Sequence, residues 1–333
     1  MPRLRRVDCS GPGITRRRRG KGFEYLDEHG NRVTDPEVLT RIRSLVIPPA
    51  WESVWICSVP NGHIQAIGTD AAGRKQYLYH EDWRKRRDAE KFEHMLEFAD
   101  ALPVMRRRCV KDLRRTDYPR ERVLACALRL LDRGFFRIGT EGYAEQNQTY
   151  GLATMLKKHI TIEGTVITFD YVAKSGKRRV QSLVDADVLE VVKGLKGRRA
   201  GGPELLAYKD GRTWTDVKSA DINAYVKDLT GGDFTAKDFR TWNGTVLAAM
   251  MLADHAGTED PDQAVVDAIK MVSDILGNTP AVCRASYVDP RVISSFEQGK
   301  TIKPAVDRLS KAGGSKDFAD RAGIEKAVIR LIS

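Results

Sequence analysis

Five side chains in the chain beyond residue 130 are suited to chemistry on a phosphodiester. They are two arginines, a lysine, an amide and a phenol: Arg137, Arg240, Lys174, Asn278 and Tyr287. A phenol of pKa ~10 is a poor nucleophile at neutral pH, but its oxygen can attack phosphorus when fixed donors meet the charge that develops on the phosphoryl oxygens. Guanidinium suits that task because it stays charged and presents a planar fork of donors, and a lysine can protonate the leaving sugar oxygen. The set predicts phosphodiester transesterification.

Each of these residues also has an ordinary structural interpretation. A single arginine in a basic protein is usually solvated or ion-paired, and a lysine near a hairpin tip commonly protects a sheet edge from pairing. An asparagine after a helix is a routine cap, and a tyrosine on an amphipathic helix usually packs in the core. Only the combination of the five favours a catalytic site.

The sequence holds no recognisable metal or cofactor motif. Its five cysteines and six histidines are scattered, with no CxxC and no HExxH, and no acidic motif of the kind that holds Mg²⁺ is present. We therefore expect no disulfide framework, no metal site and no cofactor.

The segments that carry Arg137 and Lys174 have clear local signatures. ERVLACALRLLDRG has a helical stripe of apolar residues and ends in Gly134, shortly before Arg137. VITFDYVAKSGKRRVQSLV alternates with period two and turns at Ser175-Gly176, which places Lys174 beside the tip of a hairpin.

Two further segments predict helices that position the other three residues. TAKDFRTWNGTVLAAMMLADH places Arg240 near a helix start, and PDQAVVDAIKMVSDILG has apolar residues along one face with Gly277 closing the helix. Asn278 follows that end, and the next Thr-Pro pair predicts the start of a helix on which Tyr287 lies nine positions after Asn278.

The beginning of the chain has a different texture. Residues 1–22 are rich in Gly, Pro and Arg, with the run Arg16-Arg17-Arg18-Arg19, and predict a basic arm. Residues 23–82 hold short strand-like segments and a helix near residues 36–45, with Asn61-Gly62 predicting a hairpin turn. Residues 83–333 predict a larger, mainly helical domain.

Five ordered motifs carry a family resemblance. RIGTEGYAEQNQTYGLATMLKKH, VAKSGK, FTAKDFRTW and LGNTPAVCRASYVDP have the order and approximate spacing of the type IB DNA topoisomerases of the poxvirus and bacterial group, and IPPAW followed by GHIQAIGTDAAGRKQYLYH resembles their N-terminal domain. The resemblance implies an α+β fold, in which a small antiparallel β-rich N-terminal domain and a mainly α-helical catalytic domain, of the tyrosine recombinase and type IB topoisomerase fold, clamp duplex DNA. It also implies relaxation of supercoils without ATP or metal.

The resemblance gives each of the five residues a role by position. Tyr287 resembles the nucleophile that forms a 3′-phosphotyrosyl link, Arg137 and Arg240 the pair that stabilises the pentacoordinate transition state, and Lys174 the general acid for the 5′ oxygen. Asn278 stands where many relatives have a histidine that hydrogen-bonds a phosphate oxygen. An amide can donate that bond but carries no charge, and this replacement favours a bacterial origin.

The resemblance also implies contacts with DNA. Relatives place one N-terminal segment in the major groove near the cleavage site, and here it holds Arg74, Lys75, Gln76, Tyr77 and Tyr79. Gln and Arg suit base edges, whereas Lys and Tyr hydroxyls suit phosphates; the structural alternative is a strand with alternating solvent-facing side chains. Lys177 and Arg178 are expected to contact backbone phosphates, and Lys177 could share the acid role with Lys174.

The composition agrees with a polyanionic partner. The chain has 333 residues with 56 Lys+Arg against 45 Asp+Glu, a net charge of +11, and its 41% hydrophobic residues exclude global disorder. No stretch approaches the ~20 apolar residues of a membrane span, and the polar start does not resemble a secretory signal. We expect a cytoplasmic protein of the bacterial nucleoid, monomeric, with double-stranded DNA as its partner and no membrane association.

Two alternatives remain open from the sequence. A tyrosine site-specific recombinase shares the Arg, Lys, Arg, Tyr chemistry, but usually has His three residues before the second arginine, where this chain has Lys237, and lacks the IPPAW domain. A non-catalytic DNA-packing protein would explain the charge but not five ordered motifs.

Overall fold

The computed structural model describes residues 3–311 and 321–333. The chain divides into two compact units, Met1–Glu93 and His94–Ser333, and the division falls within the long helix α2 (Glu81–Leu113). Within the described ranges, no helix is both long and apolar enough to cross a membrane.

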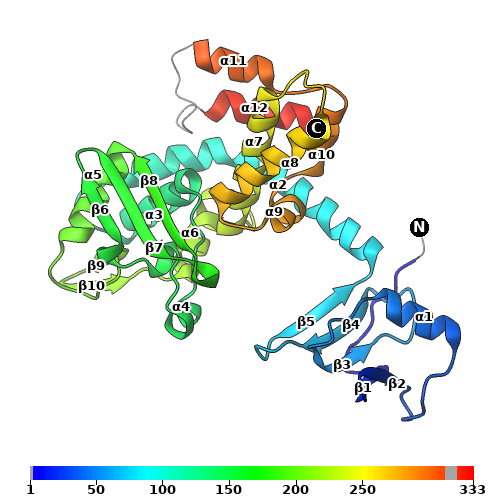
Figure 1. The fold of residues 1–333 in the computed structure, drawn as a ribbon. Coiled ribbons are helices and arrows are strands. Elements are labelled where there is room, and N and C mark those ends of the chain that lie inside the picture. The colour runs from blue at the N-terminus through cyan, green and yellow to red at the C-terminus, as the bar shows by residue number, and fades with distance from the viewer. Residues whose placement is uncertain (1–2, 312–320) are drawn as a thin grey trace. The chain divides into compact units, whose positions relative to one another are not determined.

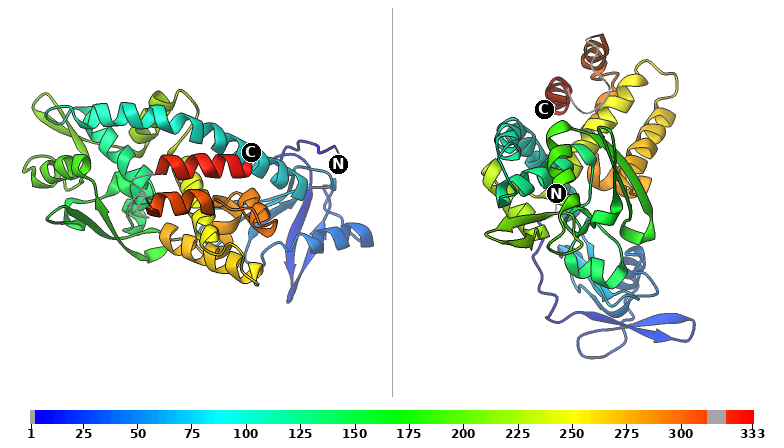
Figure 2. Two further views of the ribbon diagram at one scale, coloured as in Figure 1. Left: turned by 90° about the horizontal axis from the view of Figure 1, so that it is seen from above. Right: turned by 90° about the vertical axis from the view of Figure 1, so that its left-hand side faces the viewer.

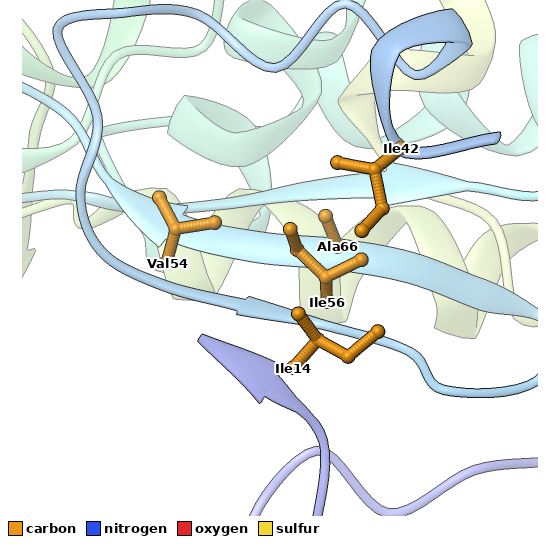
Figure 3. Packing of buried hydrophobic residues seen from close by; sticks show 5 residues of the cluster. All are labelled: Ile14, Ile42, Val54, Ile56 and Ala66. Atoms are coloured by element: carbon orange, nitrogen blue, oxygen red, sulfur yellow. The ribbon is translucent and has the colours of Figure 1, made fainter. Parts of the chain in front are cut away.

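The N-terminal unit is built on one antiparallel sheet of strand order β2-β1-β3-β4-β5. Its strands are β1 (Ile14–Arg19), β2 (Gly22–Leu26), β3 (Glu52–Ile56), β4 (Ile64–Thr69) and β5 (Lys75–Tyr79), and helix α1 spans Pro36–Ser44. Figure 3 shows the buried side chains between this helix and the sheet: Ile14, Ile42, Val54, Ile56 and Ala66. The small antiparallel sheet and its helix are as the sequence predicts.

The arginine run of the expected arm is a strand of this sheet. Residues 14–19 form β1, paired with β2 on one side and β3 on the other. Arg16 donates to the carbonyls of Pro48 (3.0 Å) and Trp51 (2.6 Å), and its guanidinium lies 4.1 Å from the centre of the Phe23 ring. The charge of the run gave no indication of a β-strand. One arginine of the four nevertheless donates hydrogen bonds within the unit instead of facing solvent.

The hairpin predicted at Asn61-Gly62 has a longer connection than the two-residue turn expected. β3 ends at Ile56 and β4 begins at Ile64, and neither Asn61 nor Gly62 has a positive φ. A Cβ added at Gly62 would lie 2.5 Å from the Sγ of Cys57. The glycine is therefore required by close packing and not by turn geometry.

The C-terminal unit is mainly helical (Figure 1). Its helices are the rest of α2, then α3 (Arg120–Gly134), α4 (Glu141–Asn147), α5 (Ala186–Gly197), α6 (Ser219–Thr230), α7 (Ala236–Asp254), α8 (Pro261–Leu276), α9 (Pro280–Tyr287), α10 (Pro290–Glu297), α11 (Lys303–Lys311) and α12 (Arg321–Ile332). Sheet β6-β7-β8 consists of Ile160–Glu163, Val166–Val172 and Arg178–Val184, and a small hairpin pairs β9 (Ala207–Asp210) with β10 (Thr213–Asp216). The two expected helices around Arg240 and Asn278 are α7 and α8.

Helix α7 is the centre of this unit. It is buried at almost every position and packs against α3, α8, α9, α10, α11 and α12. Its apolar residues therefore do not form a stripe along one side, as they would on a surface helix, because other helices surround it.

A buried ion network connects α12 to this centre. Arg106 of α2 bonds both oxygens of Asp132 (2.9 and 2.8 Å) and both oxygens of Glu325 (2.6 and 2.9 Å). Arg321 donates to the carbonyl of Asp132 (2.8 Å) and to the amide oxygen of Asn243. Figure 2 shows α11 and α12 side by side. Two guanidinium groups thus face two carboxylates, and the network is neutral although it is buried.

Replacement of Arg321 by methionine should lower the free energy of unfolding by about 3–5 kcal/mol, because two buried carboxylates would then share one guanidinium. Urea unfolding followed by far-UV circular dichroism measures the change. Lys326→Met, at an exposed position of the same helix, should stay within about 0.5 kcal/mol of the parent. Equal losses in the two variants would contradict a stabilising network.

Candidate active site

The side chains of the candidate site lie around the C-terminal end of α8. The last carbonyls of a helix have no partner within it, and they form the negative end of its dipole. Here each of four successive carbonyls accepts a hydrogen bond from an arginine. Arg179 donates to Asp274 (2.8 Å) and Ile275, Arg240 to Leu276 (2.8 Å), and Arg137 to Gly277 (2.7 Å).

Local sequence explains why α8 ends at this point. Gly277 adopts a left-handed φ of 66° and closes the helix through hydrogen bonds from its N–H to the carbonyls of Asp274 and Ser273. Glycine takes this conformation without the steric cost of a side chain. The chain then reverses through Asn278 into α9, whose N-cap Thr279 accepts a hydrogen bond from the N–H of Val282.

Arg137 lies three residues beyond α3. Helix α3 ends at Gly134, as the sequence predicts, and the left-handed residue at its C-cap is Phe135, with φ of 57°. Gly134 is needed for close packing, since a Cβ there would lie 2.3 Å from the Phe136 ring. The turn brings Arg137 to Gly277 and also to Asn278, whose side-chain oxygen accepts from the same guanidinium nitrogen.

Arg240 lies in the second turn of α7 and is only 4% exposed. It donates to the carbonyls of Phe135 and Leu276, both at 2.8 Å, and so joins the end of α3 to the end of α8. Burial, assisted by the positive charge of Arg137, lowers the pKa of Arg240 to about 10. The guanidinium remains protonated at neutral pH.

Tyr287 is the last residue of α9, and its ring centre lies 5.1 Å from the guanidinium carbon of Arg240. Burial by itself raises the pKa of the phenol, but interaction with Arg240, assisted by the charges of Arg137 and Lys237, outweighs burial and leaves the pKa below its usual value. A more acidic phenol loses its proton more readily when it attacks an electrophile.

Asn278 presents a donor beside the two arginines. Its Oδ1 accepts from Arg137, whereas its buried Nδ2 has no hydrogen-bond partner in the described part of the chain. A buried amide donor without a partner is costly. A phosphate oxygen placed next to Arg137 would satisfy it.

Lys174 is exposed at the tip of the β7–β8 hairpin, where Ser175 and Gly176 have positive φ values of 66° and 71°. It lines a pocket of about 220 Å³ together with Arg137 and residues on either side of α4, namely Gly139, Thr140, Thr149 and Tyr150. The structure thus bonds Arg137 to Asn278, places Arg240 against the Tyr287 ring, and lines one pocket with both Arg137 and Lys174.

Comparison with known proteins shows the family of the chain. Residues 80–312 match the family model described as eukaryotic DNA topoisomerase I, catalytic core, and residues 22–70 match bacterial DNA topoisomerase IB, N-terminal domain. DNA topoisomerase 1B of Acanthamoeba polyphaga mimivirus is 33% identical over 287 residues, 83% of this chain and 85% of the relative. DNA topoisomerase 1B of vaccinia virus strain Copenhagen is 21% identical over 250 residues, 74% of this chain and 75% of the viral protein.

The chain belongs to the type IB DNA topoisomerases. It is an isomerase that relaxes supercoiled DNA by transient cleavage of one strand through a phosphotyrosyl intermediate, followed by religation. The match favours this activity over the recombinase and the DNA-packing protein that the sequence left open.

In the topoisomerase, the segment that is expected to lie in the major groove forms the edge strand β5. Lys75, Tyr77 and Tyr79 are exposed on one face of the strand, with the two tyrosine rings stacked 6.0 Å apart. Gln76 lies on the opposite, less exposed face, where its Nε2 donates to Asp70 at 2.9 Å. Strand alternation therefore separates Gln76 from the tyrosines.

Two arginines of the expected DNA-contact set have carboxylate partners in the topoisomerase. Arg74 bonds Asp70 at 2.9 Å, and this hydrogen bond is the main reason that the pKa of Asp70 falls to about 2. Arg178 forms a two-pronged ion pair with Asp170 of the neighbouring strand, at 2.8 and 2.5 Å. Lys177, next to it, is exposed.

Sequence reasoning missed Gly244 and Thr245 of α7. A Cβ added at Gly244 would lie 2.5 Å from the Tyr287 carbonyl, so the glycine lets the end of α9 approach α7 closely. Thr245 donates to that same carbonyl (3.4 Å) and accepts from the N–H of Asp289 (3.1 Å). An isolated glycine within a helical pattern is the signal that could have indicated this contact.

In this topoisomerase, Arg240→Gln should raise the pKa of Tyr287, because burial would then be opposed only by the weaker effects of Arg137 and Lys237. Ultraviolet difference titration against the same variant carrying Tyr287→Phe isolates this phenol from the others. Arg137→Gln is the matched comparison and should raise the pKa less, since its charge contributes less than that of Arg240. An unchanged Tyr287 pKa in Arg240→Gln would show that the arginine does not tune the phenol.

Proposed function

We propose that Tyr287 is the nucleophile of this topoisomerase and that Arg137, Arg240, Asn278 and Lys174 assist it. The observation that carries the assignment is the anchoring of both arginines on the end of α8, next to the phenol. Attack of the Tyr287 oxygen forms a new phosphoester while the bond from phosphorus to the 5′ oxygen breaks. The phenol proton passes to solvent water, and Lys174 supplies a proton to the 5′ oxygen.

The two arginines and Asn278 meet the charge on the phosphoryl oxygens. A guanidinium has five N–H donors, and the helix carbonyls occupy only part of that capacity. Nε of Arg240 and Nδ2 of Asn278 are buried donors without a hydrogen-bond partner in the described part of the chain, and phosphoryl oxygens would satisfy them. Donors fixed before the reaction stabilise a transition state without reorganisation at the moment of attack.

Religation reverses the step. The 5′ hydroxyl attacks the phosphotyrosine, Tyr287 leaves, and the arginines again meet the developing charge. One phosphoester replaces another in each direction, so the reaction needs no ATP, and the guanidinium groups do the electrostatic work that Mg²⁺ does in other enzymes.

We also propose that the enzyme acts as a monomer on double-stranded DNA. Lys75, Tyr77 and Tyr79 on the exposed face of β5, and Lys177 at the hairpin, suit phosphate contacts. Arg74 and Arg178 would have to exchange Asp70 and Asp170 for phosphate, and Gln76 would have to leave Asp70 to reach a base edge. The location in a bacterial nucleoid stays a prediction.

Tyr287→Phe should bind DNA with unchanged affinity and form no covalent adduct, because it lacks only the nucleophilic oxygen. Denaturing electrophoresis of enzyme trapped on a radiolabelled duplex detects the adduct, and a gel-shift assay measures binding. Plasmid relaxation at the parental rate by Tyr287→Phe would overturn the assignment.

Relaxation should proceed in excess EDTA and without ATP, within about threefold of the rate with Mg²⁺ at matched ionic strength, since salt screening alone changes DNA binding. Plasmid topoisomer distributions on agarose gels provide the measurement. Loss of relaxation in EDTA that Mg²⁺ restores, but that an equal ionic strength of NaCl does not, would show that a metal takes part.

A further inference from the structure

The hairpin that carries Lys174 is fixed to the rest of the site through β8, the strand that follows the tip. Lys174 is exposed, and the turn next to it consists of two residues in left-handed conformation. β8 is an edge strand of the three-stranded sheet. The position of the lysine amine therefore depends on what holds β8.

Arg179 of β8 binds the end of α8. Its two terminal nitrogens donate to the carbonyls of Asp274 (2.8 Å) and Ile275. Its guanidinium also lies against Gly277, where an added Cβ would be 3.0 Å from Nη1. Both donors are directed at the helix end, which already holds Arg240 and Arg137.

Gln181, on the same face of β8, binds the end of α3. Its Nε2 donates to the carbonyl of Gly134 at 2.7 Å, and its Oε1 accepts from the Tyr171 hydroxyl at 3.0 Å. The Tyr171 bond fixes the orientation of the amide, since a phenol that donates must meet the oxygen. The strand is thus bonded to the helix ends that precede Arg137 and Asn278.

We infer that Arg179 and Gln181 are positioning residues that dock the Lys174 hairpin on the ends of α8 and α3. The lysine amine is thereby held at a set distance from the phosphate that Arg137, Arg240 and Asn278 bind. Neither residue touches the reacting atoms, because their donors are directed to main-chain carbonyls. The inference rests on the proposed role of Lys174 as general acid.

The chemistry of the leaving group separates this role from general support of the fold. An alkoxide leaving group needs a proton as its bond to phosphorus breaks, whereas a thiolate, from a much stronger acid, leaves without one. A defect that acts through Lys174 must therefore disappear when sulfur replaces the 5′ oxygen at the scissile phosphate. A defect in DNA binding or in folding would remain.

The test is single-turnover cleavage of two duplexes that differ only in a 5′ oxygen or 5′ sulfur at the scissile phosphate. Arg179→Gln should slow cleavage of the oxygen substrate by about 10²-fold, as expected for misplacement of a catalytic group by about 1 Å, and should leave the sulfur substrate within about threefold of the parent. Gln181→Ala should show the same selectivity with a smaller loss. Equal losses on both substrates would overturn the inference.

Val180→Thr is the matched control, because Val180 lies between the two residues on the exposed face of β8. It should cleave both substrates at the parental rate. In the double variant Lys174→Ala/Arg179→Gln, loss of Arg179 should cost nothing beyond the loss of Lys174, since the two act as a unit. Additive losses would also overturn the inference.

Lys174→Ala by itself distinguishes failure of the general-acid role of Lys174 from failure of the positioning role of Arg179 and Gln181. If it slows only the oxygen substrate while Arg179→Gln does not, the general acid stands and the positioning role fails. If Lys174→Ala slows both substrates equally, the general-acid assignment fails, and the positioning role fails with it. Thermal melting of each variant, within about 3 °C of the parent, establishes that the rates compare folded proteins.

Discussion

Four carbonyl groups at the end of one helix hold the candidate active site together. They accept hydrogen bonds from Arg179, Arg240 and Arg137, which come from a strand, a helix and a loop. Three guanidinium groups repel one another, and the lowered pKa of Arg240 shows the cost of bringing them together in a buried place. The negative end of the helix dipole offsets that cost, because it supplies oriented acceptors without adding a titratable group.

The same arrangement accounts for the backbone around the site. Gly277 ends α8 in a left-handed turn that leaves the carbonyls free for the arginines, and Phe135 adopts a similar turn so that its own carbonyl meets Arg240. Gly244 then allows α7, which carries Arg240, to approach the last residue of α9. The phenol of Tyr287 lies beside Arg240 because α7 and α9 are in contact at Gly244, which has no side chain.

The supports of the site extend far from it. Arg321 of α12 bridges the Asp132 carbonyl near the end of α3 and the Asn243 side chain one turn beyond Arg240 on α7. This fixes the two elements that meet through Phe135 and Arg240. The family model ends at residue 312, so α12 lies outside the part of the chain that it matches. The helix nevertheless stabilises the elements that carry both catalytic arginine candidates.

Sequence by itself determined the helices around Arg240 and Asn278 and the sheet of the N-terminal unit, and it named five candidate residues for the site. Periodicity, caps and turn residues act between close neighbours along the chain, so their effects are visible in one dimension. It did not show that Arg16 ties a strand, that Gly62 fits against Cys57, or that Arg179 and Gln181 hold the hairpin. Only the tertiary structure decided these contacts. An arginine can donate a hydrogen bond to any carbonyl that lacks a partner, and the packing of elements distant in the sequence selects which carbonyl it contacts.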